Sequence, residues 1–357
     1  MVNPTPPFWN RRRVLVTGHT GFKGTWLWQL LEALGAEPAG IALPPDTDPS
    51  LSALIGLPDH PRSHCLDIRD RDLLARTVQQ TQPEIVFHLA AQALVRRSYE
   101  QPMDTYSTNV MGTIHLLEAL RSTPSVRSIV VVTSDKVYQN QDRLPAYCET
   151  DPLGGHDPYS SSKACVELAV ASWRLSFFAG KTPPVGVATV RAGNVVGGGD
   201  WARDRLVPDL IRAFTSRRPA QIRHPNAVRA WIHALEPLVG YLVLAERLWN
   251  DPDRFSEAWN FGPDDSQARS VENVVRQATE LWTEGASWRP AETPSPHETM
   301  VLRLNIAKAR DRLEWRPRLE FNQTLAWTMD WYRRWHAGAD PGTLCREQIE
   351  RYLATER

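Results

Sequence analysis

The chain is short of lysine, cysteine, net charge and long apolar runs, and each shortage excludes a class of protein. Its 357 residues include four cysteines but no C-x-x-C pair, so neither a metal site nor a disulfide framework is expected, and a reducing cytoplasm is the predicted compartment. Lys and Arg number 41, as do Asp and Glu, which argues against a nucleic-acid or anionic-membrane partner. The N-terminus lacks the pattern of a signal peptide, and no apolar run has membrane-spanning length.

Lysine is the scarcest of these features. Of the 41 basic residues only five are lysine, namely Lys23, Lys136, Lys163, Lys181 and Lys308. A lysine ammonium shifts its pKa readily whereas an arginine guanidinium does not, so positions that keep lysine are candidates for chemistry. Drift in codon usage is the alternative explanation. Three of the five lie inside the motifs described next.

Tyr159 and Lys163 stand four residues apart, on one face of a predicted helix. A phenol has a pKa near 10, too high for a base at neutral pH, but a fixed ammonium beside it favours the phenolate. Such a phenolate can take the proton of an alcohol whose hydride leaves to a nicotinamide. Alone, the pair is equally typical of a solvated helix surface, so its meaning depends on finding a dinucleotide site.

The organisation of the chain predicts a doubly wound α/β fold with a parallel sheet, because strands alternate with helices. Strands are predicted over 12–17, 38–43, 84–89, 128–133 and 185–190, and helices over 26–34, 109–120, 159–177, 271–281 and 325–352. We predict a dinucleotide-binding domain over 12–190, with returns from the later chain. Residues 191–357 are expected to form mainly a smaller substrate-binding lobe.

A glycine turn lies between the first predicted strand and helix, with Gly18, Gly21 and Gly24 at equal spacing. Glycines let the backbone turn tightly and approach a pyrophosphate that rests on the helix N-terminus. His19 and Lys23, in the same loop, are either contacts to the adenosine or its phosphates or solvent-facing residues. The second strand closes without an acidic residue, and Asp46 lies too far along to be a ribose partner with any certainty.

Five short motifs in one order carry a family resemblance: Gly18-x-x-Gly21-x-x-Gly24, His88-Leu89-Ala90-Ala91-Gln92, Asn109-Val110-x-Gly112-Thr113, Ser134-Asp135-Lys136 and Tyr159-x-x-x-Lys163. Together they resemble the extended short-chain dehydrogenase/reductase family, specifically its nucleotide-sugar 4,6-dehydratases, and most closely those acting on CDP-glucose. The block Arg191 to Trp201 and the lysine at 136 are the specific parts. The resemblance runs from about residue 12 to the C-terminus.

The resemblance implies a Rossmann domain that holds NAD and a lobe that holds a nucleotide sugar. It implies cofactor contacts at Gly18, His19, Gly21, Phe22, Lys23, Gly24, Asp67, Ile68, Leu89, Ala90, Ala91, Gln92, Asn109, Tyr159 and Lys163. Substrate contacts are expected at Asn194, Trp201, Arg205, Arg229 and His233, with Arg205 near the diphosphate. Trp231, His297 and Glu298 are further candidates at the nucleotide end, each equally compatible with a structural role.

The resemblance also implies an internal redox reaction at the sugar. Tyr159, kept anionic by Lys163, removes the C4 hydroxyl proton, and Ser134 holds the C4 oxygen. Asp135 is the expected acid for the departing C6 hydroxyl. Many 4,6-dehydratases place a glutamate after that aspartate, whereas this chain has Lys136, which is either the base for C5 or a stabiliser of the enolate. Thus Ser134, Asp135, Lys136, Tyr159 and Lys163 are the predicted catalytic residues, and no metal is expected.

Three other functions remain open from the residues. A 4-epimerase or decarboxylase of the same fold shares Tyr159 and Lys163 but needs no acid–base pair at 135 and 136. A non-catalytic dinucleotide-binding regulator could dispense with the tyrosine–lysine pair. A scaffold assembled through the C-terminal helix is a third possibility. The family resemblance suggests a homodimer through helices of the Rossmann domain.

Overall fold

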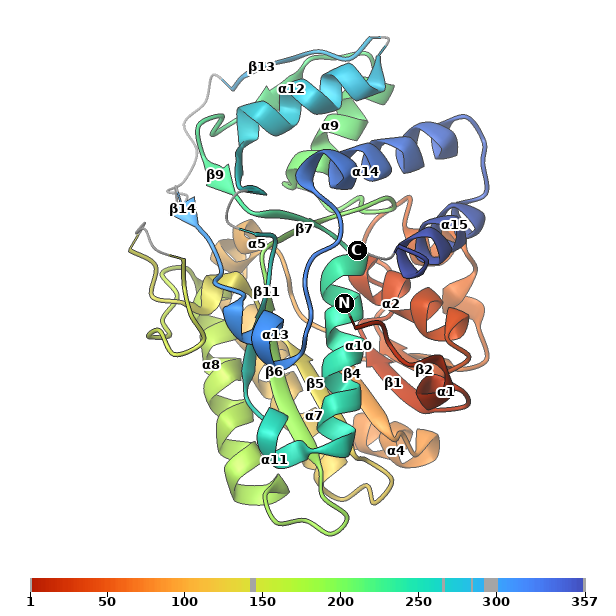
Figure 1. Cartoon of the computed structure of the whole chain (residues 1–357), viewed down its shortest axis with the longest axis vertical. Helices are drawn as coiled ribbons and strands as arrows, with labels where there is room; N and C mark the ends of the chain where they lie inside the picture. Colours follow the sequence, from red (N-terminus) through yellow and green to blue (C-terminus); the bar gives the residue numbers. More distant parts are fainter. Residues whose placement is uncertain (1, 142–145, 265–266, 284, 292–300, 356–357) are drawn as a thin grey trace.

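A central sheet of seven parallel strands organises the molecule (Figure 1). The computed structural model describes residues 2–141, 146–264, 267–283, 285–291 and 301–355. The strand order is β11-β6-β5-β4-β1-β2-β3, so the chain proceeds outward in one direction from β1 and in the other from β4. The strands are β1 (Arg13–Thr17), β2 (Glu37–Ala42), β3 (Ser63–Cys65), β4 (Ile85–His88), β5 (Ser128–Val132), β6 (Gly186–Ala192) and β11 (Ala258–Phe261). Ligands bind at such a reversal point, beyond the carboxyl ends of the strands.

Helices cover both faces of the sheet, which is why its strands are apolar on both sides. In β5, Val130 and Val132 belong to one hydrophobic core, and Ile129 and Val131 belong to the other. The first core contains α2 (Phe22–Ala33) and α10 (Leu235–Asn250), and the second contains α4 (Arg71–Thr81), α7 (Gly112–Arg121) and α8 (Pro158–Trp173). A π-helical turn, Ser107–Met111, leads into α7, and another, Arg174–Phe178, extends α8. This is the predicted doubly wound fold.

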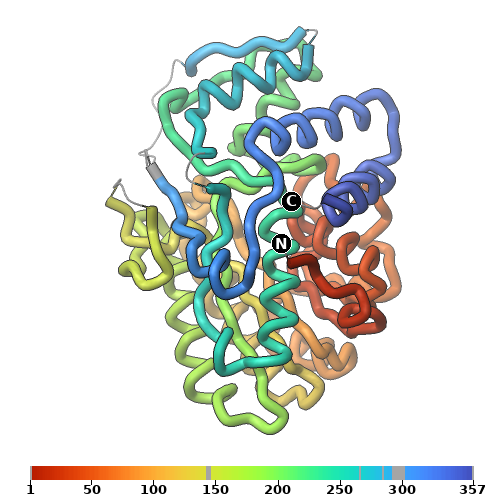
Figure 2. The backbone as a smooth tube through the Cα atoms, viewed as in Figure 1, coloured from red at the N-terminus to blue at the C-terminus, as the bar shows by residue number. Residues whose placement is uncertain are grey.

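A smaller lobe sits at one end of the sheet, at the top of Figures 1 and 2. It contains α9 (Leu206–Thr215), α12 (Val271–Trp282) and α14 (Phe321–His336), with short strands β8 (Ala220–Ile222), β9 (Val228–Arg229), β12 (Arg269–Ser270), β13 (Trp288–Pro290) and β14 (Val301–Leu302). Strands β7 (Asn194–Val196) and β10 (Trp231–His233) pair in parallel beside it. The remaining helices are α1 (Pro6–Trp9), α3 (Leu51–Leu54), α5 (Val95–Glu100), α6 (Pro102–Tyr106), α11 (Pro252–Phe255), α13 (Ala307–Arg312) and α15 (Pro341–Leu353).

The chain termini lie close together, as the smooth tube of Figure 2 shows. Asn3 donates from Nδ2 to the carbonyl of Leu353 at 3.3 Å, and its amide oxygen accepts from Arg318. The later chain also returns to the sheet, because β11 pairs with β6 and α10 packs on β5 and β6. No described helix has the length and apolarity to cross a membrane.

The prediction of one continuous helix over 325–352 is wrong. The structure has two helices, α14 and α15, separated at Gly338, whose φ of +95° suits glycine. Asp340 then accepts a hydrogen bond from the backbone N–H of Thr343 at 2.7 Å and caps α15, which has Pro341 at its start. Neither β11 nor α10 was predicted; α10 is buried along most of its length, so its sequence has little of the polar–apolar periodicity of a surface helix.

Candidate active site

A cavity of about 1200 Å³ opens beyond the carboxyl ends of β1, β4 and β5, below the lobe. Most of the predicted site residues meet on its wall, namely Gly18, Gly21, Phe22, Lys23, Gly24, Asp67, Ile68, Leu89, Ala90, Ala91, Gln92, Ser134, Asp135, Lys136, Tyr159, Lys163, Asn194, Trp201, Arg205 and Arg229. They come from segments far apart in the sequence. The fold therefore gathers the cofactor, catalytic and substrate candidates around one space.

The glycine turn is packed so closely that side chains are excluded from it. Gly18 has a φ of +75°, and a Cβ there would lie 2.7 Å from the backbone N of Ala90. A Cβ at Gly24 would lie 2.1 Å from the carbonyl oxygen of Gly18. Gly21 begins α2 without a side-chain cap, so the first N–H groups of the helix are available to an anion at the cavity wall.

The loop after β5 carries the predicted acid and its neighbours. Ser134 lies where β5 ends, and its hydroxyl donates to Oδ1 of Asp135 at 3.1 Å. The hydroxyl oxygen of Ser134 accepts from the backbone N–H of Lys136 at 3.2 Å, which holds residues 134–136 in a short turn. Asp135 is 5% exposed, so its carboxyl group reaches solvent only through the cavity.

The start of α8 supplies the tyrosine and the lysine. Asp157 caps the helix by accepting from the N–H of Ser160 at 2.9 Å, and Pro158 takes the first helical position. Tyr159 and Lys163 therefore fall on one buried face, one turn apart. The Lys163 ammonium donates to the carbonyl oxygen of Val132 at 3.1 Å, which ties α8 to the end of β5.

Burial controls the ionisation of this pair, and the prediction that Tyr159 has a lowered pKa is wrong for the structure as it stands. Burial raises the pKa of Tyr159 to about 12, although the nearby Ser134 hydroxyl lowers it, and the charge of Asp135 raises it further. Burial lowers the pKa of Lys163 to about 7, and the like charge of Lys23 acts in the same direction. Phenolate formation at this site therefore needs more than an adjacent lysine.

Lys23 extends from the first turn of α2 toward the catalytic end of the cavity. Among the described residues its ammonium forms no hydrogen bond or ion pair, and it lies 6.0 Å from the ring centroid of Tyr241. Burial lowers the pKa of Lys23 to about 8, with Arg205 lowering it and Asp135 raising it. These interactions place its charge beside the catalytic residues rather than at the opposite, Asp67 end.

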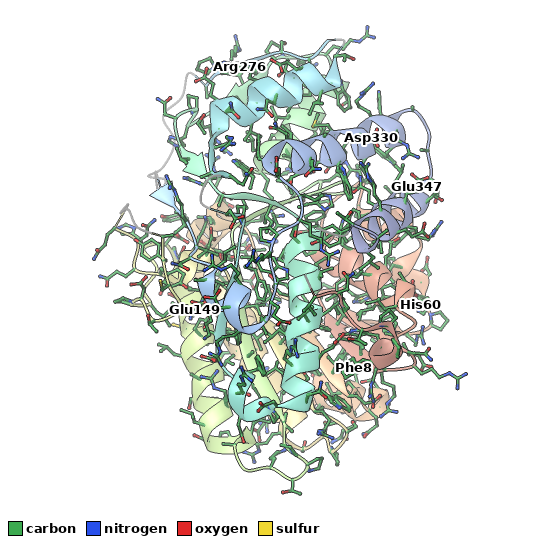
Figure 3. All side chains as sticks on the ribbon, viewed as in Figure 1. Phe8, His60, Glu149, Arg276, Asp330 and Glu347 are labelled. Atoms are coloured by element: carbon green, nitrogen blue, oxygen red, sulfur yellow. The ribbon has the colours of Figure 1, made fainter. Side chains whose placement is uncertain are left out.

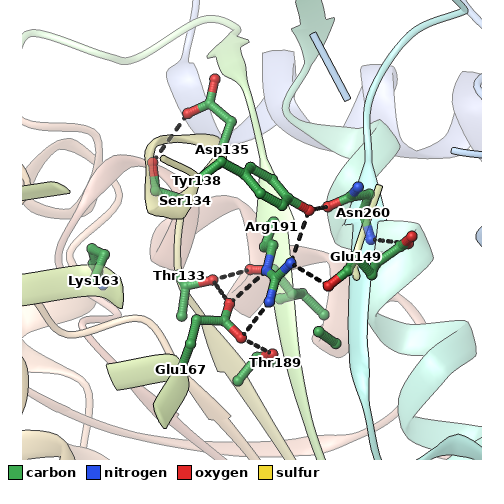
Figure 4. A network of polar contacts seen from close by, with 12 residues as sticks. Thr133, Ser134, Asp135, Tyr138, Glu149, Lys163, Glu167, Thr189, Arg191 and Asn260 are labelled. Atoms are coloured by element: carbon green, nitrogen blue, oxygen red, sulfur yellow. Dashed lines mark hydrogen bonds and ion pairs between the residues drawn. The ribbon is translucent and has the colours of Figure 1, made fainter. Parts of the chain in front are cut away.

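A buried polar network supports the catalytic residues from below (Figure 4). Glu167, one turn beyond Lys163 on α8, accepts from Nε and Nη2 of Arg191 at 2.8 and 2.9 Å. It also accepts from the hydroxyls of Thr133 and Thr189, each at 2.6 Å. Burial alone would raise the pKa of Glu167, but these donors outweigh it and lower that pKa. The carboxylate thereby joins α8 to β5 and β6.

The network continues from Arg191 toward the far edge of the sheet. Arg191 donates from Nη1 to the hydroxyl oxygen of Tyr138 at 2.8 Å, and Tyr138 donates in turn to Oδ1 of Asn260 at 2.7 Å. The backbone N–H of Asn260 donates to Glu149 at 2.9 Å. Figure 4 shows these contacts running from Glu167 through Arg191 and Tyr138 to Asn260.

The lobe side of the cavity holds the predicted substrate residues. Arg205 pairs with Asp200 at 2.9 Å, and its charge lowers the pKa of Tyr159, so Arg205 faces the catalytic end. Arg229 is buried and donates to the carbonyl oxygen of Val228 at 3.0 Å. Trp201 packs edge-on against Trp335, with ring centroids 5.1 Å apart, while part of it lines the cavity.

Comparison with known proteins identifies the architecture. The profile of the NAD dependent epimerase/dehydratase family matches residues 14–262, which is more than half of the chain. The chain belongs to this family. It is 47% identical over 350 residues to CDP-glucose 4,6-dehydratase of Salmonella typhimurium, covering 97% of this chain and 98% of that protein.

Two less similar proteins also match most of the chain. The dTDP-glucose 4,6-dehydratase of Streptomyces antibioticus is 30% identical over 341 residues, covering 92% of this chain and 94% of that one. The crystal structure of DesIV, a dTDP-glucose 4,6-dehydratase from Streptomyces venezuelae, superposes with a TM-score of 0.76 at 24% identity, covering 92% of this chain and 99% of that one. This last likeness concerns the fold.

NAD is the cofactor of the NAD dependent epimerase/dehydratase family, and the cavity fits it. The glycine turn leaves bare backbone beside the uncapped start of α2, where a pyrophosphate is accommodated without a steric clash. Asp67 and Ile68 line the same wall beyond β3. Arg69 holds the Asp67 carboxylate through Nε at 2.8 Å and lowers its pKa, so this end of the cavity has a fixed acceptor.

Three predicted contacts of this family member need correction because their side chains do not reach the cavity. His19 is fully buried under β2, with Nε2 2.7 Å from the hydroxyl of Ser63. His233 is fully buried between Trp26 and Trp327, each 5.8 Å away between ring centroids. These two side chains are packing residues, and burial lowers the pKa of His19 to about 4 and that of His233 to about 3.

The third is Asn109, which acts on the loop that follows β4. Its Oδ1 accepts from the N–H of Gln92 at 2.8 Å, and its Nδ2 donates to the carbonyl of Gln92 at 3.1 Å and to Ser162 at 2.9 Å. Asn109 therefore fixes a cavity-lining loop against α8 without lining the cavity itself. Of the other candidates, Trp231 lines the cavity, and His297 and Glu298 lie outside the described residues.

The sequence reading missed the supporting residues and two arginines of the cavity wall. Glu167 could have been predicted from the sequence, because it lies four residues beyond Lys163 on the same helix face. If that face is buried, the carboxylate of Glu167 needs a positively charged partner. Arg96 and Arg223 also line the cavity but belong to no recognised motif. Within the described residues no cluster of side chains suited to a metal is present.

Proposed function

We propose that this chain is a CDP-glucose 4,6-dehydratase, a hydro-lyase that forms CDP-4-keto-6-deoxy-glucose without net consumption of NAD. The overall similarity to the Salmonella protein supports the substrate class. The observation that carries the chemistry is the convergence of Ser134, Asp135 and Lys136 with Tyr159 and Lys163 on one cavity. A dehydratase needs an acid and a base beside its alcohol-oxidising pair, and this cavity holds all of them.

Oxidation at C4 is the first task of the site. Tyr159 takes the proton of the C4 hydroxyl, and Ser134 donates to the C4 oxygen to hold the sugar against Tyr159. When bound, NAD supplies the hydride acceptor, and later the donor. The charge of Arg205 lowers the pKa of Tyr159 and so favours its anionic form, and Lys163, one turn further along α8, is the expected second cation.

Elimination of water is the second task. A ketone at C4 acidifies the C5 hydrogen, and Lys136, in its neutral form, takes this proton; its half-buried position on the cavity wall supports this role. Asp135, in its protonated form, gives its proton to the departing C6 hydroxyl, which leaves as water. Return of the hydride to C6 and of the proton from Lys136 to C5 then completes the 4-keto-6-deoxy product. The turn that joins Ser134 to Lys136 holds the acid and the base on consecutive residues, so both face the same sugar.

A substrate panel tests the proposal. We expect conversion of CDP-glucose to a 4-keto-6-deoxy sugar, detected by mass loss of one water, and slower conversion of UDP-, dTDP- and GDP-glucose. Formation of a C4 epimer without water loss would make the chain an epimerase of the same family. Binding of NAD without conversion of any nucleotide hexose would instead indicate a regulator.

We also propose that the protein is a homodimer through helices of the Rossmann part. Large apolar side chains are exposed on neighbouring helical segments there, with Met103 82% exposed on α6, Leu168 62% exposed on α8 and Leu175 72% exposed just beyond it. Exposed apolar residues that cluster in this way are typical of an interface. Sedimentation velocity measures the assembly, and a monomer at micromolar concentration would contradict it.

A further inference from the structure

Two arginines from opposite sides of the cavity converge on one carboxylate oxygen. Arg96 lies on α5, which follows β4, and Arg223 lies just after β8 in the lobe. Their Nη1 atoms approach Oδ1 of Asp204 at 3.2 and 2.8 Å, respectively. All three residues line the cavity. A shared oxygen between two guanidinium groups is the arrangement that a phosphate oxygen also satisfies.

Asp204 is a displaceable partner. Its side chain is 43% exposed, and its backbone has a φ of +61°, a left-handed conformation that aspartate tolerates better than most residues but still at a cost. Ion pairs at this exposure are weak, because water screens them. Arg223 also donates from Nη2 to the backbone carbonyl of Asp204 at 3.4 Å, a contact that can persist when the carboxylate is displaced.

Asp200, four residues earlier in the same loop, differs from Asp204 in that its carboxylate is buried and fixed by its partners. It is 6% exposed, accepts from the N–H of Ala202 at 3.0 Å and pairs with Arg205 at 2.9 Å. The backbone carbonyl of Asp200 accepts from the hydroxyl of Tyr332 at 2.5 Å. Arg205, predicted to contact the diphosphate, is therefore already committed to a fixed partner and faces the catalytic end.

We propose that Arg96 and Arg223 bind the diphosphate of the substrate and that Asp204 occupies their anion site until the substrate displaces it. The inference rests on the proposed function, which requires a nucleoside diphosphate to lie in this cavity. Without Asp204 the two guanidinium groups carry two positive charges, which match the charge of a diphosphate. Displacement replaces Asp204 by the diphosphate as the group that links Arg96 of α5 to Arg223 of the lobe.

Calorimetric titration of CDP and cytidine tests this assignment. We expect Arg96→Met and Arg223→Met each to weaken CDP binding roughly tenfold, as for the loss of one charge-assisted hydrogen-bonded contact. Cytidine, which has no phosphate, should bind each variant within about twofold of the unaltered protein. Asp204→Asn, which keeps the side-chain shape and tolerates the left-handed backbone, should tighten CDP binding because the competing charge is gone.

A matched control removes an arginine charge elsewhere in the lobe. Arg276 on α12 is exposed at the outer surface (Figure 3) and pairs only with Glu272 among its described neighbours, so Arg276→Met should leave CDP binding unchanged. Arg96→Lys and Arg223→Lys keep the charge but lose the planar fork, and should fall between the methionine variants and the unaltered protein. Thermal melting confirms that each variant is folded.

Two results would overturn the assignment. CDP binding within about twofold of normal in both methionine variants would show that the arginines do not touch the diphosphate. Weaker CDP binding in Asp204→Asn would show that Asp204 holds the two arginines in position for CDP and does not compete with it. If the unaltered protein prefers another nucleoside diphosphate, the proposed function fails, and the same variants titrated with that nucleotide test the arginines. If the protein binds no nucleoside diphosphate, the proposed function and the assignment of the arginines both fail.

Discussion

At the residue scale, the site depends on two adjacent residues with different tasks, Asp135 and Lys136. The charge of Asp135 raises the pKa of Tyr159, so the phenol ionises more easily when Asp135 is protonated, which is also the form that the acid of the second step needs. Ser134 connects them, because its hydroxyl donates to Asp135 and lies near the phenol. Substitutions at these positions should therefore separate oxidation from elimination.

We expect Tyr159→Phe to lose both steps and Asp135→Asn to lose only the second. Removal of a positioned acid or base typically lowers a rate by about 10²- to 10⁴-fold, so product formation by Asp135→Asn should fall within that range. Reduction of the bound cofactor by CDP-glucose, followed by its near-ultraviolet absorbance, should persist in Asp135→Asn and in Lys136→Met.

The exposed aspartate Asp330 on α14 provides the control for that series (Figure 3). Asp330→Asn should match the unaltered protein in both cofactor reduction and product formation. Full turnover by Asp135→Asn would show that another group protonates the C6 hydroxyl. Loss of cofactor reduction in that variant would place Asp135 in the oxidation step instead.

At the scale of elements, the buried pair of Glu167 and Arg191 holds α8 against the ends of β5 and β6. Lys163 donates to β5 one turn away, so the position of the catalytic tyrosine follows from the attachment of this one helix. A buried ion pair adds little net stability compared with apolar packing, but removing one partner leaves a charge buried without compensation. The pair therefore fixes the position of α8 relative to β5 and β6.

Glu167→Gln should lower the free energy of unfolding by about 3–5 kcal/mol, the usual cost of breaking a buried pair. Urea denaturation monitored by tryptophan fluorescence measures it. Glu272→Gln makes the same chemical change at an exposed pair on α12, where Glu272 meets Arg276 at 2.8 Å, and should cost no more than about 0.5 kcal/mol. Equal midpoints for the two variants would contradict the structural role of Glu167.

At the scale of the whole molecule, three buried histidines make the fold sensitive to acid. Burial lowers the pKa of His19 to about 4 and the pKa values of His88 and His233 to about 3. The unfolded chain takes up a proton at each histidine below about pH 6.5, whereas the folded protein does not until the pH approaches 4 or 3. The unfolding free energy should therefore fall as the pH drops through this window.

The expected loss at pH 5, relative to pH 7, is about 2 kcal/mol for each of these histidines. Urea denaturation at the two pH values measures the total, and His233→Gln should reduce the pH dependence by the share of one histidine. The exposed His336 supplies the comparison, since His336→Gln should leave the pH dependence unchanged. An unfolding free energy that is equal at pH 5 and pH 7 would show that the buried rings are protonated in the folded state.

The sequence by itself determined the alternation of strands and helices, the glycine turn and the catalytic motifs. These are local properties: a β-branched run such as residues 128–133 predicts a strand, and three equally spaced glycines between a strand and a helix predict a tight turn. Tyr159 and Lys163 were predictable for the same reason, because a helix places residues four apart on one face.

Only the tertiary structure decided which charges and rings reach the cavity. His19 and Lys23 are four residues apart, yet the ring of His19 is packed under β2 while Lys23, in the first turn of α2, lines the cavity. The pKa of Tyr159 also depends on burial, which no spacing reveals. Arg96 precedes Asp204 and Arg223 by more than a hundred residues along the chain, and only the meeting of sheet and lobe brings the two guanidinium groups to one carboxylate oxygen.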